Sequence, residues 1–226
     1  MSFTRKNNCR SSPTYSFFGN GTANQAIRPG DLPVAFPATL RVLHVGSYSM
    51  ACEPIGLALT ALMEREKGQR LLSLDPNVRP SMVGDRAAYL GKLHHWVELA
   101  DLVKFSRADA VFVLPNGDSR DLIERWLGCG PGLVVLTAGG DEIVGATRSS
   151  WVTVDVPHVK VADTVGAGDA FMSGLLAWLR DSGRLNGRGD SQSLGRTSWR
   201  QCSRSPRRWL PSPACDGERT RLLERR

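Results

Sequence analysis

The sequence predicts an α/β fold in which helices cover both faces of a mostly parallel β-sheet. Two patterns between residues 40 and 180 support this prediction. Short runs rich in leucine and β-branched residues alternate with longer amphipathic runs, as expected for strands joined by helical crossovers. The short runs are also almost continuously apolar, which is typical of parallel strands buried on both faces.

The first two elements are a strand and a helix. The segment RVLHV at 41–45 is predicted to form a strand that ends at Gly46. The segment PIGLALTALMEREK at 54–67 is predicted to form a helix, because Pro54 suits a first helical turn and Gly68 suits the stop.

Two further strand–helix pairs follow. The segment RLLSL at 70–74 is predicted to be a strand closed by an Asp-Pro-Asn turn, and a helix is expected over 85–99. A strand over 101–105 and a helix over 118–127 repeat this arrangement. The repetition strengthens the prediction of parallel neighbours in one sheet.

The last elements complete the predicted sheet. The segment LVVLT at 133–137 has the pattern of a buried strand, broken by the glycines at 139 and 140. Residues 143–156 predict two more short strands, and residues 168–179 predict a final helix. Polar clusters follow four strand ends, at 75–79, 106–109, 137–140 and 163–169. Ligands bind beyond the carboxyl ends of strands in such sheets, so these clusters are the candidate functional regions.

The glycine-rich turn before the final helix is the most informative segment. Gly166, Ala167 and Gly168 let a ligand approach the backbone closely, and the free N–H groups of a first helical turn attract a phosphate. Asp169 would repel a phosphate unless it takes a proton from a hydroxyl group. The alternative is that Asp169 only stabilises the helix N-terminus and the glycines form a plain turn.

This turn lies in a longer pattern. Residues 163–171 match D-T-x-G-A-G-D-x-F at seven specified positions, and this pattern resembles the second signature of the ribokinase-like (PfkB) carbohydrate kinases. Residues 13–23, 74–80 and 103–106 resemble bacterial fructokinases within that family. The sequence contains no G-x-x-x-x-G-K-[ST] loop, so a P-loop kinase is not the competing explanation.

The resemblance implies a ribokinase-like three-layer αβα sandwich and transfer of the γ-phosphoryl group of ATP to a sugar hydroxyl with Mg²⁺. Asp169 would be the general base, and the N–H groups of Gly166, Ala167 and Gly168 would form the anion hole. The resemblance also places Thr137, Gly139 and Thr164 along the nucleotide, and Asp75, Asn77, Arg79, Ser106 and Asp109 near the phosphates and metal.

Purely structural roles for the residues in these loops are the alternative. Thr137 and Gly139 also suit a strand end and a turn, and Asp-Pro-Asn is an ordinary turn sequence. Ser106 and Asp109 stand where the wider family often has N-x-x-E, and they also suit a helix cap with a first-turn acid. The carboxylates at 141 and 142 replace small residues of many family members.

The resemblance begins at about residue 12 and ends at about residue 182. The family's first strand, its β-sheet lid and its Gly-Gly-Asn motif have no counterpart in the sequence. We therefore expect a disordered N-terminus at 1–11, a partial kinase core at 12–182 and low activity. The sugar contacts are the missing part, so the identity of the sugar is left open, and so is a homodimer, which relatives often form through the lid.

The positive charge is concentrated in the C-terminal tail. Residues 180–226 hold 12 Arg and 5 acidic residues, which accounts for the net charge of +7, whereas residues 1–179 hold 17 basic and 17 acidic residues. We expect residues 183–226 to be disordered, because the segment has too few apolar residues to offset its ordering entropy. The favoured interpretation of its origin is an out-of-frame continuation, and an arginine-rich nucleic-acid arm is the least favoured.

The remaining composition limits the class of protein. No apolar run approaches the roughly 18 residues of a membrane span. The five cysteines form no C-x-x-C pair, which favours a reduced cytoplasmic protein over a disulfide scaffold or zinc site. The main hypothesis is thus a sugar kinase that uses a small sugar and ATP. The alternatives are a non-catalytic nucleotide- or nucleic-acid-binding protein and a non-functional gene remnant.

Overall fold

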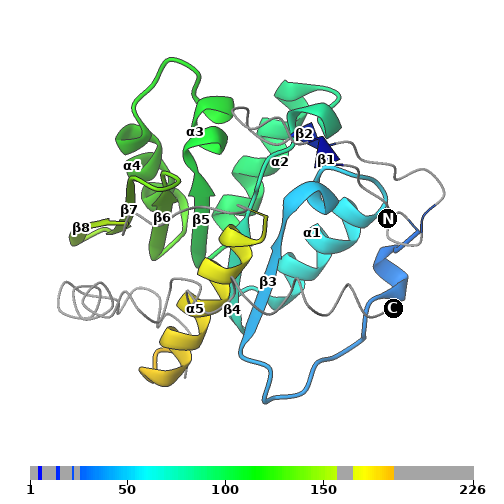
Figure 1. The fold of residues 1–226 in the computed structure, drawn as a ribbon. Coiled ribbons are helices and arrows are strands. Elements are labelled where there is room, and N and C mark those ends of the chain that lie inside the picture. The colour runs from blue at the N-terminus through cyan, green and yellow to red at the C-terminus, as the bar shows by residue number, and fades with distance from the viewer. Residues whose placement is uncertain (1–4, 7–13, 16–21, 23–25, 157–164, 186–226) are drawn as a thin grey trace, which may run out of the picture.

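The computed structural model describes residues 5–6, 14–15, 22, 26–156 and 165–185. Most of the predicted N-terminal segment at 1–11 lies outside these residues, as does the predicted tail from residue 186 onward. The described body contains a six-stranded sheet and five α-helices (Figure 1). A separate antiparallel pair joins β1 (Arg5–Lys6) to β2 (Thr14–Tyr15).

The main sheet has its strands in chain order, β3-β4-β5-β6-β7-β8. The first four strands pair in parallel, and β6, β7 and β8 pair antiparallel. Their bounds are β3 (Val42–Gly46), β4 (Leu71–Asp75), β5 (Leu102–Ser106), β6 (Leu133–Thr137), β7 (Glu142–Thr147) and β8 (Ser150–Asp155). Every strand predicted between 41 and 156 is present within one or two residues of its expected ends.

The helices also follow the prediction, with one addition. Their bounds are α1 (Ile55–Glu66), α2 (Arg86–Leu99), α3 (Arg107–Val113), α4 (Ser119–Cys129) and α5 (Ala167–Asp181). Asp85 caps α2 and Asp118 caps α4, since each carboxylate accepts hydrogen bonds from N–H groups of the first turn. The short helix α3 and the 3₁₀ turns at Pro29–Asp31, Ser47–Met50 and Pro80–Met82 were not predicted.

The helices form two layers on opposite faces of the sheet (Figure 1). One apolar cluster joins α1, α2 and α4 to one face through residues such as Val103 and Phe105 of β5. A second cluster joins α5 to the other face, where Leu175 and Leu179 pack against Leu102. The arrangement is the predicted αβα sandwich, because each sheet face must bury its apolar side chains under a separate helical layer.

The side chains of β5 alternate between these faces. Val103 and Phe105 enter the cluster under α2 and α4, and Phe105 meets the Trp126 ring edge-on at 4.8 Å. Leu102 faces α5, and by the two-residue period of a strand Lys104 faces it too. The face of β5 under α5 is therefore apolar at the start of the strand, at Leu102, and charged near its carboxyl end, at Lys104.

The carboxyl ends of β3 and β4 approach each other closely at Gly46. A β-carbon at this position would lie 1.9 Å from the Asp75 backbone oxygen.

We expect Gly46→Ala to push the strands apart and to lower the free energy of unfolding by about 1–3 kcal/mol. Urea denaturation would measure this loss. Gly91→Ala on α2 is the matched control, because open space surrounds Gly91 and alanine favours a helix. Equal stability of the two variants would contradict the prediction.

Candidate active site

A cavity of about 360 Å³ lies beyond the carboxyl ends of β3 and β4. It is lined by His44, Val45, Gly46, Ser47, Ser49, Ile55, Leu59, Asp75, Asn77 and Asp169. Three of the predicted site residues thus meet at one cavity, although Asp169 is far from Asp75 and Asn77 in the sequence. This placement follows from the parallel sheet, which gathers the loops after its strands at one edge.

The first turn of α5 opens onto this cavity. Gly166 precedes the helix with a φ of 81°, a left-handed conformation that glycine adopts without steric cost. Ala167 and Gly168 begin the helix, and their N–H groups belong to the first turn, which lacks intrahelical acceptors. Asp169 is exposed to solvent and lines the cavity. One helical turn therefore combines backbone donors without intrahelical acceptors and a carboxylate that lines the cavity.

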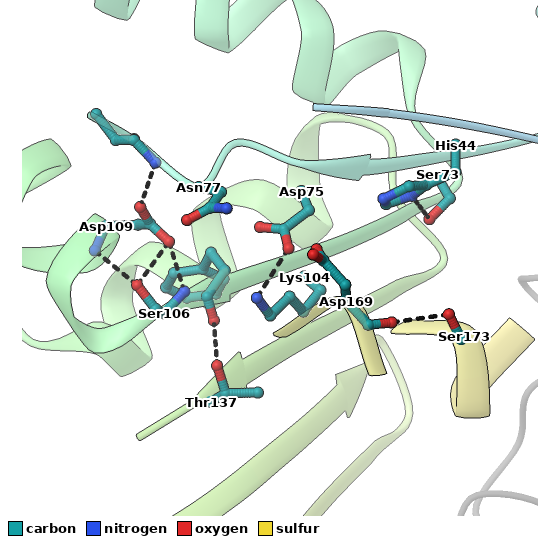
Figure 2. A network of polar contacts seen from close by, with 12 residues as sticks. His44, Ser73, Asp75, Asn77, Lys104, Ser106, Asp109, Thr137, Asp169 and Ser173 are labelled. Atoms are coloured by element: carbon teal, nitrogen blue, oxygen red, sulfur yellow. Dashed lines mark hydrogen bonds and ion pairs between the residues drawn. The ribbon is translucent and has the colours of Figure 1, made fainter. Parts of the chain in front are cut away.

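Behind this turn lies a buried ion pair (Figure 2). The Lys104 ammonium donates a hydrogen bond of 2.8 Å to Oδ2 of Asp75, and each residue is 4% exposed. Burial raises the pKa of the Asp75 carboxyl above its usual value, although the adjacent ammonium opposes the shift. The other carboxylate oxygen, Oδ1, has no hydrogen-bond partner among the described residues.

His44 forms the opposite wall of the cavity. Its Nδ1 lies 3.1 Å from the hydroxyl of Ser73 on the neighbouring strand. Although the residue as a whole is exposed, desolvation of its ring lowers the pKa of His44, and the carboxylates of Asp75 and Asp169 oppose this shift. A neutral imidazole near pH 7 leaves the cavity with more negative than positive side chains.

The pair Ser106 and Asp109 forms a capping box at the start of α3. One Asp109 oxygen accepts bonds of 2.7 Å from both the N–H and the hydroxyl group of Ser106. The other accepts a bond of 2.7 Å from the N–H group of Val78, in the loop after β4. Both oxygens are thus used within the protein, and Asp109 ties the loop at 75–79 to β5 and α3.

Thr137 lies at the end of β6, and Gly139 lies in the loop that follows. Thr137 ends the strand with its hydroxyl 3.5 Å from the Phe105 carbonyl oxygen, and Gly139 turns the chain with a φ of 66°. The two carboxylates that depart from the family pattern, Asp141 and Glu142, both pair with an arginine. The Arg107 guanidinium lies 3.3 Å from Asp141 and 3.5 Å from Glu142, so these negative charges are partly neutralised beside the predicted nucleotide position.

Backbone strain also concentrates at the cavity. Among the described residues, the non-glycine positions with positive φ are Ser47 at 61° and Asn77 at 38°, and both line the cavity. Such conformations are uncommon outside glycine and often occur where a loop must present groups to a ligand. This observation favours a binding role for the loop at 75–79 over an ordinary turn.

The predicted site residues fall into three groups. Asp169, Asp75 and Asn77 line the cavity, and Gly166, Ala167 and Gly168 directly precede Asp169 at the start of α5. Residues at or just after the ends of β5 and β6 lie along the same sheet edge: Ser106, Asp109, Thr137 and Gly139. Arg79 contacts the backbone oxygens of Asn77 and Val78. Thr164 lies outside the described residues.

Sequence reasoning gave no role to His44 or Lys104. The sequence around Lys104 could have indicated a role, because a lysine inside an otherwise apolar buried strand needs a charged partner. The sequence around His44 was less informative, since histidines on strands are common at protein surfaces. Within the described part of the chain, no three His, Cys, Asp or Glu side chains converge to hold a metal ion. No helix in that part has the length and apolarity needed to cross a membrane.

Comparison with known families settles the classification. The model of the pfkB family of carbohydrate kinases matches residues 13–191, which is most of the chain. The chain belongs to the pfkB family. This membership confirms the resemblance seen in the sequence, and the matched range includes the glycine-rich turn before α5.

Individual pfkB relatives agree. The fructokinase of Rhizobium leguminosarum bv. trifolii is 39% identical over 167 residues, covering 74% of this chain and 51% of that protein. The fructokinase of Salmonella thompson is 33% identical, covering 75% and 77% respectively. The Vibrio cholerae O395 fructokinase structure, with fructose, ADP and a calcium ion bound, matches with a TM-score of 0.66 at 29% identity, covering 80% and 57%. This pfkB chain therefore spans about half the length of the first of these relatives.

Proposed function

We propose that the chain carries the phosphoryl-transfer site of an ATP-dependent sugar kinase of the fructokinase type. The observation that carries the proposal is the position of Asp169, an exposed carboxylate in the first turn of α5 that faces the cavity. Backbone N–H groups of the same turn lack intrahelical acceptors. One short segment therefore offers a proton acceptor for a hydroxyl and donors for an anion, which phosphoryl transfer requires together.

The roles of the residues follow from this geometry. Asp169 takes the proton of the sugar hydroxyl as that oxygen attacks the γ-phosphorus of ATP. The N–H groups of Gly166, Ala167 and Gly168 bind the equatorial oxygens, where negative charge is spread in the transition state. ATP then lies along the ends of β5 and β6, beside Thr137 and Gly139, with Thr164 as a further nucleotide contact.

Magnesium is expected to arrive bound to ATP. Both oxygens of Asp109 are already hydrogen-bonded, and Lys104 holds one oxygen of Asp75. The described residues thus do not supply a ready set of metal ligands. This agrees with the usual behaviour of Mg²⁺, which keeps several waters and binds mainly through substrate phosphates. Asp75, Asn77, Arg79, Ser106 and Asp109 accordingly shape the phosphate end of the site.

Sugar-dependent ADP release by the 226-residue chain tests the proposal. The assay supplies ATP and Mg²⁺ with fructose, ribose or 2-keto-3-deoxygluconate. We expect fructose to give the highest rate, in keeping with the fructokinase relatives at 39% and 33% identity. Higher turnover with another sugar would keep the kinase and change its substrate. Release of ADP that is independent of every sugar, or no release by folded protein that binds ATP, would contradict the proposal.

A further inference from the structure

Lys104 is the least expected residue in the sheet. It occupies the third position of β5, between Val103 and Phe105, which are both fully buried. A lysine is rarely buried to this degree unless it is paired, because removing an ammonium group from water is costly. Such a residue needs a reason that packing alone does not supply.

The contacts of Lys104 place it directly behind the turn that opens α5. Its Nζ is held by Oδ2 of Asp75 at 2.8 Å. A β-carbon built on Gly168 would lie 3.0 Å from the same Nζ, so the ammonium rests against the backbone of Gly168. Figure 2 shows Lys104 joined to Asp75, with Asp169 nearby. The side chain therefore links β4 and β5 to the first turn of α5.

The charges around the cavity explain why an ammonium is needed there. The carboxylates of Asp75 and Asp169 both line the cavity, and His44 adds no full positive charge while it is neutral. A transferring phosphoryl group brings further negative charge into this space. Lys104 contacts Asp75 from the sheet, and because it is itself buried its charge acts more strongly than it would at the surface.

We propose that Lys104 is a positioning residue for phosphoryl transfer, which holds the turn at Gly168 in place and offsets the charge of Asp75. The inference rests on the proposed function and deepens it. It assigns the ammonium to the support of the anion-binding turn and not to general packing. A side chain at position 168 would press on the ammonium, because even a β-carbon there would lie 3.0 Å from Nζ.

The test compares four versions of the full chain: wild type, Lys104→Met, Lys104→Met combined with Asp75→Asn, and Lys92→Met. The combined variant replaces the buried pair with neutral side chains, so it should recover stability that Lys104→Met loses by leaving Asp75 unpaired. Lys92 is the control, because its ion pair with Glu53 is exposed and lies on α2, away from the cavity.

We expect the turnover number to fall roughly 10- to 100-fold in both Lys104 variants, because a small misplacement of reacting groups has effects of this size. The KM for ATP should change less than threefold, and the melting temperature of the combined variant should return to that of the wild type. Recovery of wild-type turnover together with the melting temperature would overturn the inference, since Lys104 would then be only a counter-ion.

A binding measurement separates this inference from the proposed function. Calorimetry with ADP alone and with ADP plus aluminium fluoride, in the presence of Mg²⁺ and fructose, needs no turnover. We expect the Lys104 variants to lose roughly 10- to 100-fold in affinity for the fluoride complex and to keep their affinity for ADP. Equal losses for both ligands, or no loss for either, would overturn the role of Lys104 even in an active enzyme. A preserved difference in a chain without turnover would support that role and contradict the proposed activity.

Discussion

Replacing Asp169 with asparagine is expected to lower the turnover number for sugar-dependent ADP release roughly 10²- to 10⁴-fold, the usual contribution of a positioned general base. Asparagine has the same shape as aspartate but cannot accept the proton of the attacking hydroxyl. Because Asp169 is exposed and its side chain takes part in no described ion pair, the variant should fold like the wild type. The affinity for ATP should not fall, since a carboxylate near the phosphates is removed.

The matched control for this experiment lies on the same helix. Asp181 is the last residue of α5 and pairs with Arg180. It lies at the opposite end of the helix from Asp169. Asp181→Asn should keep wild-type turnover. If Asp169→Asn also kept it while the wild type showed sugar-dependent activity, Asp169 would not be the base and the assignment of the turn would be wrong.

Replacing Asp109 with alanine is expected to lower the free energy of unfolding by about 2–5 kcal/mol. The carboxylate is 3% exposed and satisfies the N–H groups of Val78 and Ser106. Each buried donor left without a partner costs about 1–3 kcal/mol. The variant should also release the loop at 75–79 from α3, so turnover should fall with stability. Urea denaturation, followed by activity measured well below the transition, would separate the two effects.

Asp85→Ala gives a measure of what an ordinary cap contributes. Asp85 caps α2 through the N–H groups of Ala87 and Ala88 in an exposed position, so its loss should cost only about 1 kcal/mol. An Asp109 variant no less stable than this control, but with a much higher Mg²⁺ requirement, would show that Asp109 serves the metal and that its hydrogen bonds are secondary.

Much of the fold was accessible from the sequence because its signals are local. The strands are short apolar runs, and Gly46, Gly68 and Pro54 mark the ends of neighbouring elements. The helix α3 was missed for a physical reason. It has only seven residues, too few to display a helical period, and it follows β5 without a loop. The capping signal at Ser106 and Asp109 was noticed, but the sequence did not distinguish a cap from a metal contact.

The candidate site was predicted where one segment carries it and missed where it depends on contacts between strands. The turn at 163–171 is contiguous, so its pattern could be recognised. The pair of Lys104 with Asp75 joins residues 29 positions apart, and the pair of Arg107 with Asp141 joins residues 34 apart. Only the register of the parallel strands brings such residues together, and no single segment contains that information.

The alternation of β5 has a consequence for how this protein tolerates change. Phe105 packs in the core on one face while Lys104 serves the cavity on the other. A slip of one residue against β6 would turn the ammonium into the apolar cluster beneath Trp126 and point the phenyl ring at the cavity. Two effects thus destabilise a misregistered form of this strand: the burial of a charge and the loss of an aromatic contact. An insertion or deletion within β5 should therefore be among the least tolerated in the chain, although the strand is only five residues long.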